Sequence, residues 1–526
     1  MKAKMKRNLC LVLVVALFVT VMTGCGGKKK VGVFESDMPT GVVSYPIKTD
    51  ETLTYWCALP ASIATDVVTF GETDFAKDLE KKTGIKVEYV HPAAGTAGEA
   101  FQLMMASGKM ADMIQTGWLS RGPQSYIDNK QIYNIGEIMD SGYTPHLKAF
   151  LDENKDVEKM IKTDSGQYYG FPFVRNDDLL LSSAGLMLRS DWLEADGLSV
   201  PETIDEWTEV LKAFKNRCDA PIAMFSYDLP YFASGFDTYY GEYIKDGKIV
   251  YGPTENNFKN YLAKMNEWYK AGYIDQNYAI ADSANINSNI LNGKSGVTFG
   301  AGGGGLGTYL NEKKGTEFDL AAAPFPSAKK GEPAKFGGKE LKYGLSAVAI
   351  TTSCKNPALA ARFLDYGYSE EGHMTYNFGK EGASYNMVDG YPTYVEEITA
   401  NPEGKSMAQM LAHNCMAGGS GPFVQDRRYI EQYYAKPQQQ DALVQWSSCE
   451  MEKYKVPQII MTTDEQDDYA AIMGEINTYV SEMMNKFITG EESLGKFDDF
   501  VADIKKMGID EALTIKQAAY ERYLKR

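Results

Sequence analysis

The chain has 526 residues, of which 70 are acidic and 54 basic, and its formal net charge at pH 7 is −16. Such an excess of acid argues against a nucleic-acid ligand, because phosphate backbones are recognised by basic surfaces. The length exceeds what one hydrophobic core usually supports, so we expect two lobes or domains.

The N-terminal segment is typical of an export signal. Basic side chains crowd residues 2–7, an apolar run follows over residues 9–22, and Met-Thr-Gly-Cys ends the segment at Cys25. The run is too short for a stable membrane span, and small residues precede the cysteine, as in lipoprotein signals. We predict a signal peptide over residues 1–24, lipidation of Cys25 and anchoring at the extracellular face of the cell membrane. An ordinary cleaved signal with an unrelated cysteine is the alternative.

A flexible tether and the start of an α/β lobe are predicted next. Residues 25–50 carry lysines, prolines and few large apolar side chains, which favours a tether. Residues 53–56 are expected to form a first strand. A helix capped by Thr73 and ended by Gly84 follows, and residues 85–90 alternate as a second strand.

The next segment predicts one edge of a ligand cleft. Residues 99–107 have helical spacing, and residues 112–114 form another short strand. Ligands of open α/β sheets gather outside the carboxyl ends of the strands. We therefore expect Trp56, Gln115 and Trp118 to lie beside a cleft.

Later helices are indicated by caps and apolar periodicity. They are predicted over residues 203–214, 256–270 and 356–372, the last ended by Gly372, and over most of residues 464–526. The capping box of Thr203 and Glu206 places Trp207 on the buried face of its helix. The aromatic passage at residues 167–174 is suited to a chain crossing between lobes.

A glycine-rich run formally matches a dinucleotide-binding motif. Gly302, Gly304 and Gly307 fit Gly-x-Gly-x-x-Gly after a strand-like stretch. We reject a nucleotide ligand, because the run is almost all glycine, lies in mid-chain and belongs to an exported protein. A flexible cleft loop is the expectation.

Little in the chain indicates catalysis or metal binding. Its four histidines are scattered, and neither His-Glu-x-x-His nor Gly-x-Ser-x-Gly occurs. The cysteines beyond the signal are widely spaced, which favours small buried residues over zinc ligands or disulfides; they are Cys57, Cys218, Cys354, Cys415 and Cys449. We predict no enzyme activity, cofactor or metal. A surface glycoside hydrolase or lyase is the alternative, since no carboxylate pair can be singled out from sequence.

Short segments occur in one order over nearly the whole chain. They are FQLMMASG (101–108) with DMI (112–114), YGFP (169–172), LRSDWL (188–193) with VPETIDEW (200–207), DGKIVY (246–251), NP (356–357) through YSEEG (368–372), EG (381–382) with Tyr385, and KKMG (505–508). This ordered set resembles the bacterial extracellular solute-binding proteins of ABC importers, the class that contains maltose-binding and alginate-oligosaccharide-binding proteins.

The resemblance implies an α/β, periplasmic-binding-protein-like fold of two unequal lobes joined by a hinge, with ligand held between them. It implies chain crossings at residues 168–172, 342–350 and 381–387. The implied lobes are residues 51–171 with 346–382, and residues 172–345 with 383–526. The sequence holds no Asp-x-Asn-x-Asp-Gly calcium loop, so a structural calcium is left open.

A cleft for sugar needs aromatic rings for C–H faces and polar side chains for hydroxyls. The aromatic candidates near predicted cleft loops are Trp56, Trp118, Tyr227, Phe232, Tyr239, Phe423 and Trp446. The polar candidates are Gln115, Arg175, Asp177, Asp178, Glu381, Asp426 and Arg427. For each ring the alternative is core packing, and for each charge it is a solvated loop.

The resemblance also implies a function. We expect a lipid-anchored, monomeric receptor that captures a small-molecule ligand, an oligosaccharide by preference, and presents its closed form to the permease subunits of an ABC importer. A receptor for a peptide or another solute stays open.

Overall fold

The computed structural model describes residues 36–400 and 405–526. The predicted signal peptide, the predicted lipidation site Cys25 and much of the predicted tether lie outside these residues. The chain divides into two units after Asp37, and the unit Met38–Arg526 is the subject below. Along the described residues, no helix combines the length and apolar character needed to cross a membrane.

The first lobe begins with the predicted strand, helix and strand. β1 (Thr52–Trp56) pairs in parallel with β2 (Lys86–Val90), and α2 (Asp74–Thr83) connects them. The Thr73 hydroxyl accepts a hydrogen bond from the Ala76 N–H at 3.1 Å. Gly84 ends the helix at a φ of +73°. Both predicted caps are confirmed, and each satisfies backbone groups that the helix leaves open.

A helical layer follows, and it contains Trp118. α3 (Ala97–Ser107) leads to β3 (Met113–Thr116), which is parallel to β1. The next elements are η2 (Trp118–Arg121), α4 (Pro123–Asp128), α5 (Ile135–Asp140), α6 (Pro145–Glu153), α7 (Lys155–Ile161) and β4 (Phe171–Arg175). The rings of Phe101, Trp118 and Tyr126 meet edge to face, with centroids 5.5 to 5.8 Å apart. This cluster is core.

One six-stranded sheet organises the first lobe, in the order β13-β4-β10-β3-β1-β2. β10 (Tyr343–Ile350) lies inside it and is antiparallel to both β3 and β4. β13 (Val424–Gln425) pairs in parallel with β4 at the edge. Two strands that follow the three-stranded sheet of the second lobe in sequence therefore complete the first lobe.

The second lobe is built on a three-stranded sheet with β5 (Ala184–Arg189) at its centre, antiparallel to β8 (Val297–Ala301) and β9 (Leu320–Ala322). The other elements of this part are η3 (Asp178–Leu181), α8 (Ser190–Asp196), α9 (Ile204–Phe214), η4 (Leu229–Phe236), β6 (Glu242–Lys245), β7 (Lys248–Tyr251), η5 (Gly252–Thr254), α10 (Asn256–Lys270), η6 (Tyr278–Ile280), α11 (Ser283–Leu291), the π-helical turn η7 (Gly302–Gly307) and α12 (Thr308–Glu312).

The core of the second lobe is aromatic. The Phe232 ring lies edge-on to the Trp207 ring at 5.2 Å and to the Trp268 ring at 5.3 Å. All three side chains are buried. Trp207 is therefore a core residue, as predicted, and Trp268 is buried with it. The Thr203–Glu206 capping box of α9 is also confirmed.

The helix predicted to run to Gly372 is two helices. α13 (Pro357–Asp365) starts after Asn356, as expected, but it ends at Asp365 and passes through η8 (Tyr366–Tyr368). α14 (Glu370–Phe378) then begins, capped by the Ser369 hydroxyl. Gly372 lies inside α14, where a Cβ would come 1.7 Å from the Tyr366 carbonyl oxygen. The glycine allows this close turn between two helices, and the prediction that it ends one helix was wrong.

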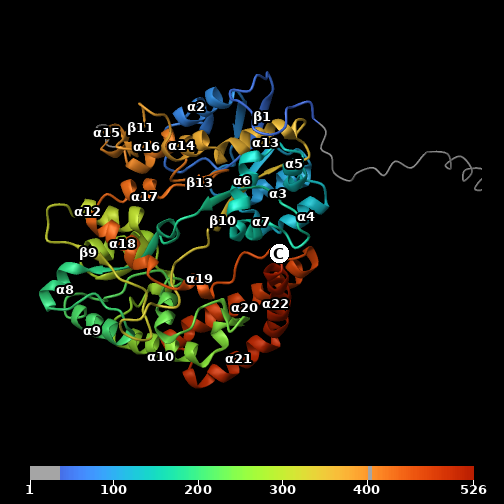
Figure 1. The fold of residues 1–526 in the computed structure, drawn as a ribbon. Helices are drawn as coiled ribbons and strands as arrows, with labels where there is room; N and C mark the ends of the chain where they lie inside the picture. Colours follow the sequence, from blue (N-terminus) through green and yellow to red (C-terminus); the bar gives the residue numbers. More distant parts are fainter. Residues whose placement is uncertain (1–35, 401–404) are drawn as a thin grey trace, which may run out of the picture. The chain divides into compact units, whose positions relative to one another are not determined.

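The remaining elements are β11 (Tyr385–Val388), β12 (Tyr391–Tyr394), α15 (Glu396–Thr399), α16 (Met407–Asn414), α17 (Arg427–Tyr433), α18 (Pro437–Ser447), α19 (Met451–Tyr454), α20 (Thr463–Thr489), η9 (Leu494–Lys496), α21 (Phe497–Lys506) and α22 (Ile509–Leu524). The predicted helical tail is confirmed. Figure 1 shows β1, α2, α13 and α14 in one lobe and α8, α9, α10 and α21 in the other.

The expected passage near residue 383 differs from the observed packing. Side chains of β11, β12 and α16 pack with Phe378 of α14 in one buried cluster, and α16 contacts α2. β13 still belongs to the first sheet. The chain leaves that sheet only after Gln425.

The C-terminal helix is joined to the first lobe by ion pairs at Asp164, which follows α7. Arg522 Nε lies 2.7 Å from Asp164 Oδ2, and the Arg526 guanidinium contacts the other oxygen. Arg522 also pairs with Glu465 of α20 at 2.5 Å. The Asp164 side chain is only 4% exposed, so its charge depends on these two cations.

Replacement of Asp164 tests this junction. Asp164→Asn leaves two arginines without their shared carboxylate and should lower the free energy of unfolding by roughly 1–3 kcal/mol. Urea denaturation measures the change. Asp152→Asn is the matched control, because Asp152 pairs with Lys148 and Lys155 at a site where its side chain is 53% exposed. Equal effects of the two variants would contradict a special role for Asp164.

Trp118 gives a second stability prediction. Trp118→Ala empties a site that is 1% exposed and should lower the free energy of unfolding by about 3–5 kcal/mol. Thermal or urea unfolding of the unliganded protein checks it. Leu103→Ala on α3, where the side chain is 73% exposed, should change stability by less than about 0.5 kcal/mol. An unchanged melting temperature for Trp118→Ala would return this ring to the list of candidate ligand contacts.

Candidate functional site

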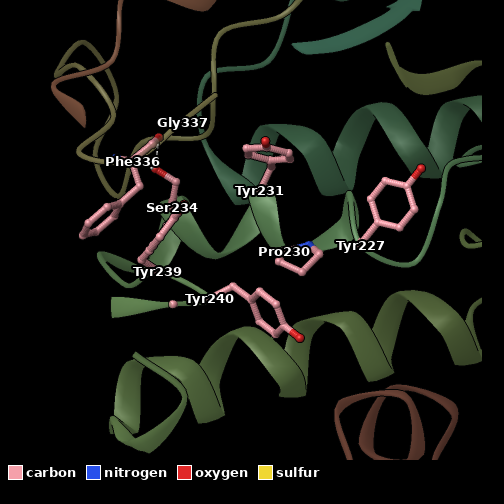
Figure 2. Close-up of a pocket in the computed structure, with 9 residues that line it drawn as sticks. Tyr227, Pro230, Tyr231, Ser234, Tyr239, Tyr240, Phe336 and Gly337 are labelled. Atoms are coloured by element: carbon pink, nitrogen blue, oxygen red, sulfur yellow. Dashed lines mark hydrogen bonds between the residues drawn. The ribbon is translucent and has the colours of Figure 1, made fainter. Parts of the chain in front are cut away.

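An aromatic pocket opens in the second lobe, and Figure 2 shows its lining. It holds about 150 Å³ and is lined by Tyr227, Pro230, Tyr231, Ser234, Tyr239, Tyr240, Gly241, Phe336 and Gly337. The Tyr231 ring stacks on Phe299 with centroids 4.6 Å apart and an interplanar angle of 6°. The Tyr239 ring stacks on Phe336 at 5.5 Å. Flat ring faces of this kind fit the C–H faces of sugars.

The sheet of the second lobe positions this pocket. Ile222 forms a parallel bridge to Val297 at the start of β8, so the chain after Ile222 runs toward the carboxyl end of that strand. Phe225 and Tyr227 stack there at 4.9 Å, and Tyr227 is 66% exposed. The carboxyl edge is where ligands of α/β sheets bind. An exposed ring at that edge is a ready contact for a ligand.

A carboxylate is buried beside these rings. Asp228 precedes η4 yet makes no side-chain cap to it, and the residue is 6% exposed. Burial raises the pKa of Asp228 to about 7. The Asp228 charge also raises the pKa of the Tyr227 and Tyr231 hydroxyls, to which burial contributes more. The carboxylate therefore lies within electrostatic reach of two pocket tyrosines.

A second pocket lies in the first lobe and has a mostly apolar lining that includes Tyr55, Cys57, Tyr89, Gln115 and Tyr376. Gln115 accepts a hydrogen bond from the Tyr55 hydroxyl at 2.6 Å and donates to the Ser420 carbonyl at 2.8 Å. The Gln115 amide thus cross-links β1, β3 and the loop before β13. Gln115 lines this pocket, but its amide oxygen and its amide nitrogen are both already hydrogen-bonded within the protein.

Five predicted ligand rings lie in the core. Trp56, Trp118, Phe232, Phe423 and Trp446 are all buried. Trp118 donates to the Ile114 carbonyl at 3.3 Å, and Trp446 donates to the Leu186 carbonyl at 3.1 Å. Phe423 packs on Phe173 at 5.1 Å. A position after a strand does not decide which way a ring turns, and here each ring turns inward.

The charged candidates near the first crossing are held by one another and by neighbouring residues. Arg175 forms an ion pair with Glu340 and donates to the Leu180 carbonyl at 3.0 Å. Burial lowers the pKa of Arg175 to about 10. Asp178 pairs with Lys339 at 3.1 Å. These contacts tie the segment after β4 to the segment before β10, which is a structural task.

Of the other charged candidates, Asp177 and Arg427 make contacts within the protein and Glu381 is exposed to solvent. Asp177 accepts a hydrogen bond from the Leu179 N–H at 3.0 Å and starts η3. Arg427 pairs with Glu431 at 2.8 Å and with Asp177 at 3.4 Å. Glu381 is exposed in the first lobe. None of these three lines the aromatic pocket.

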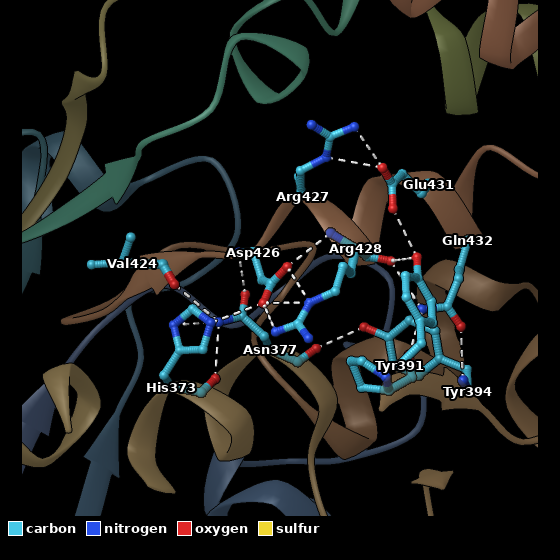
Figure 3. Close-up of polar contacts among 11 residues, drawn as sticks. His373, Asn377, Tyr391, Tyr394, Val424, Asp426, Arg427, Arg428, Glu431 and Gln432 are labelled. Carbon is cyan, nitrogen blue, oxygen red and sulfur yellow. Dashed lines mark hydrogen bonds and ion pairs between the residues drawn. The ribbon is translucent and has the colours of Figure 1, made fainter. Parts of the chain in front are cut away.

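Asp426 belongs to a polar network at the end of β13, drawn in Figure 3. His373 Nε2 lies 2.9 Å from Asp426 Oδ2, and Arg428 Nη2 lies 2.5 Å from the same oxygen. Asn377 Oδ1 accepts the Asp426 N–H at 2.8 Å. Burial raises the pKa of Asp426, but the bonds from His373 and Arg428 outweigh it and hold the pKa below its usual range. The network fixes β13 to α14 and α17.

The glycine-rich run is a packed turn rather than the expected flexible loop. The Tyr434 ring packs so closely against η7 that a Cβ on Gly302 would lie 2.4 Å from it. Gln439 donates to the Gly302 carbonyl at 2.8 Å, and Gly302 and Gly307 are buried. The glycines are needed because side chains from α17, from Tyr434 just after it and from α18 approach η7 closely.

Two expectations concern cysteines and metal ions. Cys57, Cys354, Cys415 and Cys449 are buried, as predicted, while Cys218 is half-buried, and all five are free thiols. Burial raises the pKa of Cys57 to about 12, which leaves it a poor nucleophile at neutral pH. Among the described residues, no group of three or more His, Cys, Asp or Glu side chains is placed to hold a metal ion.

Of the predicted residues, the structure brings Tyr227 and Tyr239 together in the aromatic pocket. Sequence reasoning missed Tyr231 and Phe299, the ring on which it stacks. A usable signal was present, since residues 225–240 read FSYDLPYFASGFDTYY, with seven aromatic residues around the Asp and Pro that start η4.

Comparison with known proteins identifies the family. The model for bacterial extracellular solute-binding protein matches residues 71–374, more than half of the chain. FusA of Streptococcus pneumoniae, a fructooligosaccharide ABC transporter substrate-binding protein, is 22% identical, and the match covers 96% of each chain. Lipoprotein LipO of Bacillus subtilis is 25% identical over 85% of this chain and 88% of its own. Alginate-binding protein AlgQ2, in a crystal structure without calcium, matches with a TM-score of 0.72 and 24% identity over 91% of this chain and 100% of that one. The chain belongs to the bacterial extracellular solute-binding proteins and has their two-lobed fold.

Proposed function

We propose that this solute-binding protein captures an oligosaccharide and delivers it to the permease subunits of an ABC importer. The observation that carries the proposal is the aromatic pocket of the second lobe, where Tyr231 stacks on Phe299 and Tyr239 stacks on Phe336. Ring faces that line an open pocket match what a sugar ring requires. The fructooligosaccharide-binding role of FusA and the alginate-binding role of AlgQ2 support the same class of ligand.

Binding is proposed to close the two lobes on the ligand. A ligand that touches both lobes gains its full set of contacts only in the closed form, so it shifts the open–closed equilibrium by that difference. The crossings that must accommodate this motion are the segments beside β4 and β10, where the hydroxyls of Tyr169 and Tyr343 contact each other. We propose that the first lobe comprises residues 51–171 and 346–425. The second lobe comprises residues 172–345 and the chain after Gln425.

The protein is proposed to act as a monomer held to the extracellular face of the membrane by lipid on Cys25. The export signal at residues 1–24 supports this, as does the lipoprotein description of LipO. A tether of residues 25–50 would allow the folded body to reach a membrane permease. The ligand can be a neutral or an acidic oligosaccharide, because fructooligosaccharides are neutral whereas alginate carries carboxylates.

The pocket is tested by removal of one stacked ring. Tyr231→Ala should weaken oligosaccharide binding by roughly 1–3 kcal/mol, since it removes a ring face that desolvates the sugar. A thermal-shift screen against an oligosaccharide panel identifies a ligand, and titration calorimetry measures the affinity. Tyr231→Phe is the matched control, because it keeps the ring and should keep most of the affinity. Full affinity in Tyr231→Ala would remove this pocket from the proposal.

The anchor is tested separately. Cys25→Ala should release the protein from membranes, because the diacyl group at this cysteine supplies the two chains that stable attachment needs. Fractionation of cells that express either form measures the distribution. Cys218→Ala serves as the control, since this cysteine lies in the folded body and its loss should leave the protein on the membrane. Continued sedimentation of the Cys25 variant with membranes would count against lipidation at this residue.

A further inference from the structure

Another pocket with aromatic walls has a lining from both of the lobes proposed above, and we call it the junction pocket. It holds about 200 Å³. Its first-lobe walls come from the loop after β1, with Pro60 and Ser62, and from α16 and the loop that follows it, with Ala412. Tyr429 and Tyr433 of α17 supply the second-lobe wall. By contrast, every residue that lines the aromatic pocket belongs to the second lobe.

The first sheet positions the junction pocket. β1, β2 and β3 run in parallel, and the loop with Pro60 and Ser62 follows the carboxyl end of β1. Ligands of α/β sheets bind at this edge. The same loop is tied to α16, because Asp66 Oδ2 lies 3.0 Å from Nε2 of His413. Contacts within the protein therefore shape the pocket.

Two stacked rings form the wall from α17. The ring centroids of Tyr429 and Tyr433 are 5.6 Å apart, and the interplanar angle is 17°. Tyr429 is buried, whereas Tyr433 is half-buried. The Tyr433 ring also lies against η7, where a Cβ on Gly303 would come within 2.8 Å of it. Tyr433 is thus packed on the second lobe, while the walls from the β1 loop and α16 belong to the first.

The chemistry of the lining favours a neutral sugar. Of the described residues that line the junction pocket, none carries a charge, and the same holds for the aromatic pocket. Burial of an ionised group without a partner is costly, so the carboxylate of a uronate suits neither pocket. A neutral sugar ring presents C–H faces to aromatic rings, and its hydroxyls can bond to hydroxyls such as those of Ser62 and Tyr433.

β8 and η7 connect the two pockets. The Tyr231 ring of the aromatic pocket stacks on Phe299 of β8. Gly303, four residues later, meets the Tyr433 ring of the junction pocket. Four residues of extended chain span at most about 14 Å. One oligosaccharide can therefore extend from one pocket toward the other.

We propose that the junction pocket is a second subsite of the ligand site, that it takes a neutral sugar residue of the same oligosaccharide, and that it couples binding to lobe closure. This inference rests on the proposed function and selects the neutral over the acidic ligand. The aromatic pocket alone does not favour the closed form, because its lining belongs to one lobe. A sugar between Tyr433 and the loop after β1 contacts both lobes, and it loses contacts when they part.

Titration calorimetry tests the subsite with kestose, raffinose and maltotetraose as neutral probes and trigalacturonate as the acidic probe. The unmodified protein should bind at least one neutral probe and should not bind trigalacturonate. Tyr433→Ala should weaken the neutral probe roughly 10-fold, because a ring face is lost. Ala412→Phe should weaken it to a similar extent, because the added ring fills the pocket from α16 while Tyr433 stays in place.

Tyr479→Ala is the matched control. Tyr479 is also a half-buried ring stacked on a neighbour, Phe500, at 5.7 Å, but it lines neither pocket. This variant should lose stability much as Tyr433→Ala does and should bind the neutral probe as the unmodified protein does. Melting temperatures of all variants verify that they are folded at the temperature of the titration.

Small-angle scattering tests the coupling to closure. The neutral probe at saturation should reduce the radius of gyration of the unmodified protein. It should do the same for Tyr231→Ala, whose missing ring belongs to a pocket of one lobe. Tyr433→Ala, saturated with the same probe, should compact less. Equal compaction of Tyr433→Ala and the unmodified protein overturns the coupling.

The outcomes separate this inference from the function on which it rests. Full affinity in Tyr433→Ala or in Ala412→Phe, or an equal loss in Tyr479→Ala, overturns the subsite. A loss of binding in Tyr231→Ala would then still support oligosaccharide capture. Tight binding of trigalacturonate by the unmodified protein overturns the restriction to neutral sugars. Failure of every probe to bind the unmodified protein overturns both proposals.

Discussion

The first lobe depends on a strand that reaches it only after the chain has built the three-stranded sheet of the second lobe. β10 supplies an inner position of the six-stranded sheet and pairs on one side with β3 and on the other with β4. Gly170 permits this approach, because a Cβ there would lie 2.8 Å from the Val348 carbonyl oxygen. Contacts between residues so distant in sequence form late and at an entropic cost. Neither lobe is therefore an independent unit of the chain, and any hinge motion has to leave this pairing intact.

Much of the local structure could be predicted from the sequence, because caps and periodicity act over a few residues. Thr73 and Gly84 bound a helix as expected, and the Thr203–Glu206 box starts another. The errors arose where distant residues decide the outcome. Gly372 has the character of a helix terminator, yet it meets the Tyr366 carbonyl inside a helix. Which lobe holds residues 383–425 likewise depends on a distant contact, because β13 pairs with β4.

The candidate site was less accessible to sequence reasoning, for a physical reason. Aromatic content predicts that sugar-binding rings exist, but the same rings also build the core, and only packing separates the two. Trp118 faces Phe101 in the interior, whereas Tyr227 is exposed beside the pocket.

The burial of the thiols affects how readily the protein is oxidised. Five free cysteines in a member of an extracellular family would ordinarily invite oxidation or mixed disulfides. Burial raises the pKa of Cys57, Cys354 and Cys415 to about 12, and only the thiolate is reactive. These three thiols are therefore expected to react slowly with oxidants at neutral pH. A cysteine introduced at an exposed position of each lobe could therefore be labelled with a maleimide dye, with little competition from the buried native thiols.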